Sequence, residues 1–222
     1  MKRRPNSPSP ATRPRLPRSR WDSIVKAATI EFKEKGYEGA SIRDIADHVG
    51  LLKGSLYNYI SGKADLFLAV VKPPSSELIS AVEELEQSDV SVADALHRLI
   101  LLQVDIFHRH YPAPFVYLAH VQSHIHPEFA EWDARYLRAV RQVLLRGLER
   151  GEVRNDVNID VAVRTITGSL AWMMAWYKPR DPESDAVIVD TITKILSDGL
   201  AARASSPQRP SGSLKSWPGR ER

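Results

Sequence analysis

A cluster of hydrogen-bonding side chains lies between residues 40 and 63, in the segment ASIRDIADHVGLLKGSLYNYISGK. Leu56 and Ile60 are four residues apart, so both can pack inward from one face of a short helix. The polar side chains around them then lie on or near the outer surface: Lys53, Ser55, Tyr57, Asn58 and Tyr59. Side chains of these types hydrogen-bond to phosphate oxygens and base edges. The pattern therefore favours a nucleic-acid contact.

A preceding helix is needed to position this surface, and the sequence supplies one. Ser41 is a good N-cap, and Asp44 stands three residues later, close to a capping-box pair. The apolar residues that follow recur at helical spacing: Ile42, Ile45, Ala46 and Val49. Gly50 comes where a chain that leaves a helix favours a positive φ. A helix, a glycine turn and a second helix indicate a helix-turn-helix.

A wider set of residues around this motif carries a family resemblance. It comprises an amphipathic helix ending in Glu34-Lys35-Gly36-Tyr37, then Ser41-Ile42-Arg43-Asp44-Ile45-Ala46, Gly50, Gly54-Ser55-Leu56-Tyr57, Tyr59 and Lys63. Residues 21–71 thus resemble the N-terminal DNA-binding domain of the TetR family of transcriptional repressors. The resemblance implies a homodimer that binds a roughly palindromic double-stranded operator and is released by a small-molecule effector.

The DNA-binding residues expected on this basis divide into two groups. Base-edge contacts are expected from Arg43, Lys53 and Ser55, and phosphate contacts from Tyr57, Tyr59 and Lys63. Ser41, Gly54 and Asn58 complete the expected interface. Lys63 begins the next helix, where a phosphate would explain a cation close to the positive end of the helix dipole.

Composition narrows the class of protein. Of the 222 residues 43% are hydrophobic, enough for a core, and there is no cysteine, which fits a reducing compartment. No apolar run is long enough to span a membrane, so no membrane partner and a cytoplasmic location are expected. The sequence shows no Gly-rich phosphate loop, no GxSxG elbow and no cysteine nucleophile, which argues against an enzyme, and no cofactor is expected.

Charge and proline content divide the chain. Residues 1–20 carry seven cations and no acid, whereas the formal net charge of the whole chain is only +4. Residues 1–18 form a Pro/Arg-rich arm that either adds phosphate or minor-groove contacts or is a solvated extension. We expect a helix-turn-helix domain over 19–66, a helical effector-binding and dimerisation domain over 67–203, and a Ser/Pro/Arg-rich tail over 204–222.

The second domain reads as a run of helices, so the predicted fold is all-α: a three-helix head followed by a helical bundle. Pro73 and Pro74 predict a break or sharp kink at Lys72–Ser75, because proline removes a backbone donor and clashes with the preceding turn. Further helices are expected over about 76–86, 91–110, 115–125, 127–150, 158–177 and 184–203.

The stretch Gly168–Arg180 is similar to the penultimate helix of a TetR branch that governs fatty-acid, steroid or other acyl-CoA breakdown. This similarity implies an acyl-CoA or related large apolar effector, and a different hydrophobic or drug-like ligand is the alternative. Large side chains in a small helical domain could line a pocket for it. The candidates are Phe107, Phe115, Tyr117, His120, Trp132, Trp172, Met173 and Trp176. The two tryptophans of this stretch, one turn apart, could instead serve core or dimer packing.

Apolar stripes on the last two helices suggest a four-helix dimer interface. The candidates are Val163, Ile166 and Leu170 on the first helix, and Val187, Ile188, Thr191 and Ile195 on the second. The same residues could serve the core of the subunit. His120 and His124, four residues apart, with His126 nearby, raise the possibility of a metal site, but histidines satisfied by hydrogen bonds explain them more simply, so no metal is expected. A helical adaptor without sequence-specific DNA binding is the alternative from another class.

Overall fold

The structure is a computed structural model that describes residues 18–120, 127–177 and 182–202. The described chain is all-helical, as predicted, apart from one isolated bridge between Val153 and Ala201. The elements are α1 (Arg18–Gly39), α2 (Ile42–His48), α3 (Lys53–Leu56), α4 (Lys63–Gln87), α5 (Val92–His110), α6 (Ala113–His120), α7 (Glu128–Glu149), α8 (Ile159–Trp176) and α9 (Pro182–Leu200). None of these helices is long and apolar enough to cross a membrane.

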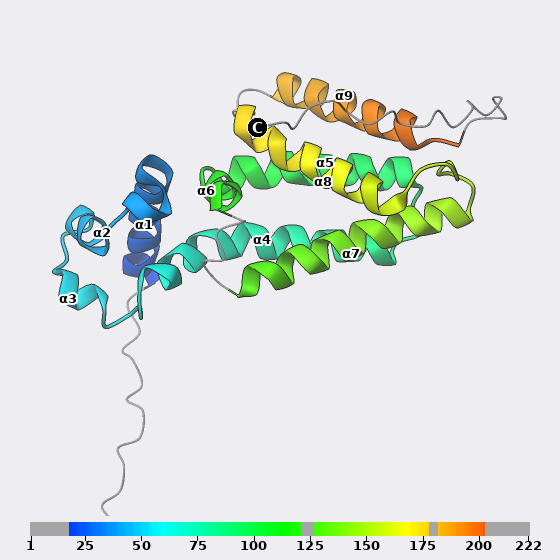
Figure 1. The fold of residues 1–222 in the computed structure, drawn as a ribbon. Coiled ribbons are helices and arrows are strands. Elements are labelled where there is room, and N and C mark those ends of the chain that lie inside the picture. The colour runs from blue at the N-terminus through cyan, green and yellow to red at the C-terminus, as the bar shows by residue number, and fades with distance from the viewer. Residues whose placement is uncertain (1–17, 121–126, 178–181, 203–222) are drawn as a thin grey trace, which may run out of the picture.

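The head formed by α1, α2 and α3 lies at one end of the molecule, and α4 runs from it into the bundle (Figure 1). The local signals act as expected: the Ser41 side chain accepts a hydrogen bond from the Asp44 amide, and Gly50 adopts a φ of 63°. The α-helical part of α3 is shorter than predicted, since it ends at Leu56. Bonds of the i→i+3 type, such as Tyr59 N to Leu56 O at 3.0 Å, carry the chain on to Ile60 as tight turns.

The expected break at Lys72–Ser75 is wrong, because α4 is one continuous helix from Lys63 to Gln87 with both prolines inside it. Tertiary packing holds the helix together here. Val70, Val71 and Pro74 are buried, the first two in the core of the head, so the neighbouring helices fix the backbone on both sides of the prolines. Helical stability in proteins comes mostly from such packing and not from propensity.

The bundle is built around α4, α5, α7 and α8, with α9 packed along α5 (Figure 1). Its core consists of apolar side chains from all of these helices, among them Leu99, Ile100, Leu144, Ile166 and Leu170. The head has a separate core that includes Phe32, Leu56 and Phe67, and this core extends onto α6 and α7 through Val116, Phe129 and Trp132. The first turn of α4 and the beginning of α7 therefore belong to the head as much as to the bundle.

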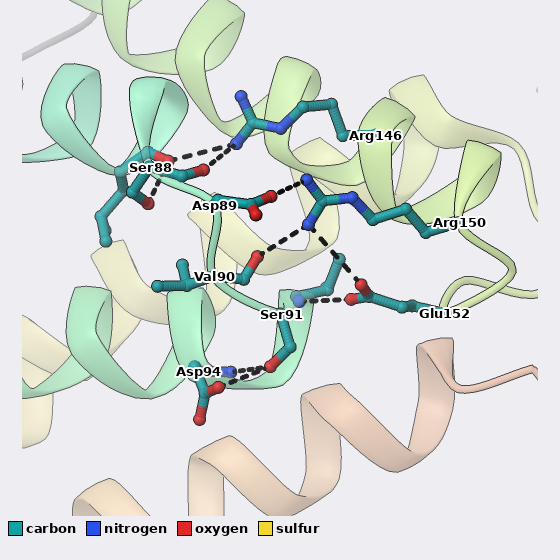
Figure 2. A network of polar contacts seen from close by, with 10 residues as sticks. Ser88, Asp89, Val90, Ser91, Asp94, Arg146, Arg150 and Glu152 are labelled. Atoms are coloured by element: carbon teal, nitrogen blue, oxygen red, sulfur yellow. Dashed lines mark hydrogen bonds and ion pairs between the residues drawn. The ribbon is translucent and has the colours of Figure 1, made fainter.

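A polar network fixes the far end of α4 (Figure 2). The Arg146 guanidinium donates to the carbonyls of Leu85 and Ser88, each at 3.2 Å, and to that of Glu86. The last carbonyls of a helix lack the usual partners within it, and Arg146 of α7 supplies donors to them. In the same network the Val92 amide at the start of α5 donates to the Glu152 carboxylate at 2.7 Å. The turn between α4 and α5 is thereby tied to the end of α7.

Candidate functional site

The polar surface predicted around α3 is present and exposed. Tyr57 is 44% exposed, and Lys53, Gly54 and Asn58 are exposed with it, whereas Ser55 and Tyr59 are partly buried. Arg43 is exposed on α2, with its guanidinium 3.9 Å from the Asp47 carboxylate. Ser41 is partly buried because its hydroxyl caps α2.

Lys63 makes internal contacts that the sequence did not indicate. Its ammonium donates to the carbonyls of Glu38 and Ala40, at 3.3 and 3.2 Å, and lies 4.4 Å from the centre of the Tyr37 ring. The lysine at the start of α4 therefore satisfies carbonyls at and just beyond the end of α1. These contacts hold the end of α1 against the start of α4.

Sequence reasoning overlooked Leu52 as a surface residue. Leu52 precedes α3, and 80% of it is exposed, the largest exposed fraction among the exposed large hydrophobic residues of the described chain. An apolar side chain beside polar donors is a feature of surfaces that contact the thymine methyl group in the major groove. Its signal in the sequence was weak, because a leucine is more often buried than exposed.

The bundle holds a cavity of about 340 Å³ lined by residues from five helices. It is lined by Pro74, Ser75, Leu78 and Ile79 of α4, Gln103 and Ile106 of α5, Pro114 and Tyr117 of α6, Trp132, Asp133, Tyr136 and Leu137 of α7, and Arg164, Thr167, Gly168 and Ala171 of α8. Most of this wall is apolar. Cavities of this size and character, with a few polar groups, are typical of small-molecule sites.

A carboxyl–phenol pair lies in the cavity wall. The Tyr117 hydroxyl donates to the Asp133 carboxylate at 3.0 Å. Burial raises the pKa of Asp133, and the hydrogen bond from Tyr117 partly offsets this rise. Burial, reinforced by the neighbouring carboxylate, raises the pKa of the Tyr117 phenol. The phenol therefore keeps its proton at physiological pH and remains the donor of the pair.

The predicted pocket residues divide between three places. Tyr117 and Trp132 line the cavity. Phe107 and Met173 are buried in the bundle core and do not line it, and Trp172 and Trp176 are 69% and 51% exposed. The expectation that these four residues line the pocket is corrected. The side chains of Phe115 and His120 lie outside the described ones.

Several polar residues of the cavity were missed, among them Gln103, Asp133, Tyr136 and Arg164. Gln103 did leave a signal, because it falls on the stripe of α5 that otherwise carries Leu99, Ile106 and other buried apolar residues. A polar residue at a core position marks either a buried network or a ligand site. The other three show no comparable signal, since their positions also suit the outer face of an amphipathic helix.

The dimer candidates on α8 lie inside the subunit. Val163, Ile166 and Leu170 are at most 4% exposed and belong to the bundle core, so they are not available to a partner. The outward face of the same helix carries Val161, Trp172 and Trp176 instead. Because α8 carries hydrophobic residues on both faces, the sequence does not show which face is buried, and only the packing of the helix decides it.

On α9 the predicted stripe does reach the surface. Val187 and Ile195 are 64% and 66% exposed, and Thr191, halfway between them at helical spacing, is exposed as well. Ile188 is partly buried and packs against the bundle core. We call these exposed residues of the two helices the α8–α9 face: Val161, Trp172, Trp176, Val187, Thr191 and Ile195.

Polar contacts tie α4 to its neighbours along its length. Near the head, the Lys72 ammonium lies 3.0 Å from the Glu128 carboxylate of α7. Beside the cavity, Arg109 pairs with Glu77, and farther along Arg135 binds Glu83 through two hydrogen bonds of 2.9 and 2.7 Å. Each arginine lowers the pKa of its glutamate partner, because the cation favours the ionised carboxylate.

A chain of aromatic rings joins the cavity to the head. Trp132 in the cavity wall lies 5.4 Å from Phe129, Phe129 lies 5.8 Å from Phe67 of α4, and Phe67 lies 5.3 Å from Phe32 of α1, between ring centres. These distances fall within the range of favourable aromatic contacts. A change in the cavity wall therefore has an unbroken packed route to the helix-turn-helix.

The structure does not describe the three histidines considered for a metal site, His120, His124 and His126, as a set of side chains. His124 and His126 lie outside the described residues. Within the described ranges, no three His, Asp or Glu side chains come together in a way that could hold a metal ion.

Comparison with known protein families identifies the family that has these two domains. A family model described as bacterial regulatory proteins of the tetR family matches residues 24–70, and one described as a tetracyclin repressor-like C-terminal domain matches residues 89–200. The chain belongs to the TetR family. It is accordingly a DNA-binding transcriptional regulator, with the head as its helix-turn-helix.

Individual TetR-family relatives extend the match to most of the chain. The transcriptional repressor KstR2 of Rhodococcus jostii is 26% identical over 205 residues, which cover 88% of this chain and 98% of the relative. The structure of the ketosteroid transcriptional regulator KstR2 of Mycobacterium tuberculosis is similar, with a TM-score of 0.73 at 22% identity over 85% of this chain and 98% of the other. The structure of AibR in complex with isovaleryl coenzyme A and operator DNA gives a TM-score of 0.67 at 21% identity, over 79% and 97%.

Proposed function

We propose that this TetR-family regulator is a homodimeric repressor whose affinity for a roughly palindromic operator falls when a coenzyme A thioester enters the cavity. We assign DNA binding to residues 19–66, and effector binding and dimerisation to residues 67–203. The observation that carries the proposal is the position of α4. On this helix Pro74, Ser75, Leu78 and Ile79 line the cavity, while four residues nearer its start are buried in the core of the head: Leu66, Phe67, Val70 and Val71. A ligand that displaces this wall displaces the recognition surface with it.

The chemistry of the cavity suits the acyl part of such an effector. Apolar side chains from α4, α5 and α8 would cover an acyl group, which favours binding by removing apolar surface from water. Arg164 is the one cation among the described lining residues, and it is exposed. A cation at that position suits the phosphate-bearing part of a thioester. KstR2 is a repressor, and AibR was solved with a coenzyme A thioester, which agrees with this assignment.

The proposed DNA contacts follow the exposed head surface. Arg43, Lys53 and Ser55 would read base edges, and Tyr57 and Tyr59 would bind phosphates. Ser41, Gly54, Asn58 and Lys63 remain proposed contacts, and we add Leu52 as an apolar one. In a two-fold dimer the two α3 helices must be separated by about 34–36 Å, one turn of DNA. Apolar residues on the α8–α9 face suit the required subunit contact.

The test is an operator-binding titration. Fluorescence anisotropy of the full chain with DNA from upstream of its own gene is measured at fixed salt, with isovaleryl coenzyme A, stearoyl coenzyme A or free coenzyme A. A coupling free energy of about 1–3 kcal/mol predicts binding weakened about 5- to 150-fold by an effective thioester and unchanged by free coenzyme A. No release by any thioester would contradict the effector class and favour a different apolar or drug-like ligand.

A pair of cavity variants makes this test specific. Ala171 lines the cavity, whereas Ala134 is exposed on α7 and does not line it. Ala171→Trp should fill part of the cavity and abolish release while DNA binding persists. Ala134→Trp makes the same change in side-chain volume outside the cavity and should respond as the unaltered protein does. Equal response of both variants would show that the effector binds elsewhere.

A further inference from the structure

Two polar groups in the cavity wall have no hydrogen-bond partner. Gln103 of α5 is 4% exposed, and its side-chain Oε1 is buried without a donor. The hydroxyl of Tyr136 of α7 is also buried and unpaired. Both residues line the cavity. Other polar side chains in the same wall do have partners. The Asp133 carboxylate accepts a hydrogen bond from the Tyr117 hydroxyl at 3.0 Å, and the Thr167 hydroxyl donates to the Val163 carbonyl at 2.9 Å.

The fold gains nothing from leaving these two groups unpaired. A buried donor or acceptor without a partner lowers the stability of the folded state, and most buried polar groups in proteins are paired. Gln103 sits on the buried stripe of α5, where Leu99, Ile100 and Ile106 are aliphatic. A leucine at this position would continue the stripe without the cost. The stability of the fold therefore does not explain why Gln103 and Tyr136 are polar.

The chemistry of the pair defines what would satisfy it. Gln103 Oε1 is an acceptor and needs a donor. Tyr136 is a phenol whose pKa is raised by burial, so it holds its proton and can donate. A hydroxyl group offers one proton and two lone pairs, which serve both partners. An ether or carbonyl offers only the acceptor, and a hydrocarbon offers neither.

We propose that the cavity recognises a neutral hydroxyl group on an otherwise apolar ligand body, with Gln103 as its acceptor and Tyr136 as its donor. The proposal deepens the proposed function, since it rests on the same cavity and specifies one group on the acyl part of the effector. The apolar body lies against the wall formed by Leu78 and Ile79 of α4. Such a site rejects analogues that lack the group, because they leave buried polar atoms unpaired.

Three naphthalene derivatives of nearly equal size isolate the hydroxyl. In 2-naphthol the substituent is a donor and an acceptor, in 2-methoxynaphthalene it is an acceptor only, and in 2-methylnaphthalene it is neither. Calorimetric titration of the full chain at pH 7 should show 2-naphthol binding at least about tenfold more tightly than either analogue. Equal affinities of 2-naphthol and 2-methoxynaphthalene would overturn the role of Gln103 as acceptor.

Matched substitutions assign the preference to residues. Gln103→Leu should weaken 2-naphthol binding about tenfold while 2-methylnaphthalene binds as well as before or better. Tyr136→Phe should also reduce the preference. Gln142→Leu makes the same change on α7 outside the cavity lining and should leave the preference intact. A preference that survives in Gln103→Leu would overturn the proposal.

The stability of the ligand-free variant is a second readout that a structural glutamine would not produce. Gln103→Leu should melt at the same temperature as the unaltered chain or higher, because it removes an unpaired buried group. A lower melting temperature would mean that Gln103 serves the fold, and would overturn the proposal.

The outcomes separate this inference from the proposed function. If all three compounds bind equally, or none binds, hydroxyl recognition fails, whereas release of operator DNA by coenzyme A thioesters is still judged by its own titration. If 2-naphthol is preferred and no thioester releases the DNA, hydroxyl recognition stands and the thioester assignment fails.

Discussion

Single residues in this molecule carry roles that their types alone do not reveal. Lys63 is the clearest case, because a cation at the start of a helix suggested a phosphate, while its ammonium binds the carbonyls of Glu38 and Ala40 and lies over the Tyr37 ring. Asp133 is a second case: it is an acid in a cavity wall, held by a phenol and not by a cation. Both residues lead to measurable expectations.

Substitution of Lys63 should affect stability and DNA binding together. Lys63→Ala removes two hydrogen bonds and a cation–π contact, so the head should lose about 1–2 kcal/mol of unfolding free energy. If it also contacts a phosphate, binding to all duplexes should weaken alike, and the salt dependence should fall by about one unit. Urea unfolding and anisotropy at several salt concentrations measure both. Lys26→Ala, at an exposed position of α1, is the control, and a change of sequence preference in Lys63→Ala would contradict the assignment.

The pH dependence of stability should depend in part on Asp133. Folding raises the pKa of Asp133 above its ordinary value of 3.8, so its contribution to the free energy of unfolding is present below pH 3.8 and is lost as the pH rises through the folded pKa. Asp133→Asn, which cannot ionise, should therefore be more stable than the unaltered chain at pH 7 and nearly equal to it near pH 4. Thermal melts across this range check the sign. Tyr117→Phe should steepen the effect, because the hydrogen bond that lowers the Asp133 pKa is gone, and an unchanged slope in both variants would exclude Asp133 as its source.

At the scale of elements, α4 connects the two halves of the chain. Its first turns are buried in the head, its middle forms a cavity wall, and its end is held by Arg146 (Figure 2). The prolines at 73 and 74 leave two carbonyls of the preceding turn without helical partners, in the region where head and cavity meet. A helix with fewer internal hydrogen bonds at this point suits a connection that must respond to a ligand.

Removal of the Arg146 side chain should loosen the anchored end of α4. The guanidinium serves three carbonyls, and hydrogen bonds from a charged donor are worth about 1.5–3 kcal/mol, so Arg146→Ala should cost roughly 2–4 kcal/mol of unfolding free energy. Arg138→Ala, also on α7, removes an exposed pair 3.7 Å from Glu83 and should cost less than about 1 kcal/mol. Urea unfolding compares them. Equal costs would mean that the network in Figure 2 contributes no more than a surface ion pair.

At the scale of the whole molecule, the α8–α9 face is an apolar surface without cover from its own subunit. Its two tryptophans were expected in a pocket or a core, yet they lie on the outside of α8 with Val161. Exposed apolar surface of this kind marks an interaction site. A second copy of the chain is the partner that the TetR-family homodimer requires.

A charge in the α8–α9 face should separate the subunits. Ile195→Glu places a carboxylate at a 66% exposed position of α9, where pairing across a two-fold axis would bury it twice. Analytical ultracentrifugation at micromolar concentration should show a shift from dimer to monomer. Ile30→Glu makes the same change on α1, at a position that is 37% exposed, and should remain dimeric. Dissociation of the control, or persistence of the Ile195→Glu dimer, would place the interface elsewhere.

The sequence by itself determined the class of fold, the helix-turn-helix and most helix boundaries. These depend on short-range signals: the caps at Ser41, Ser91 and Asn158, the positive φ of Gly50 and Gly151, and apolar residues at helical spacing. Such signals act over a few residues and so can be read along the chain. The tertiary structure alone decided the rest. It turned Leu170 inward and Trp172 outward, kept α4 continuous through its prolines, gave Lys63 its partners and left Gln103 unpaired in the cavity wall. Each of these depends on which distant helix packs where, and burial and pairing between distant segments are not encoded in local spacing.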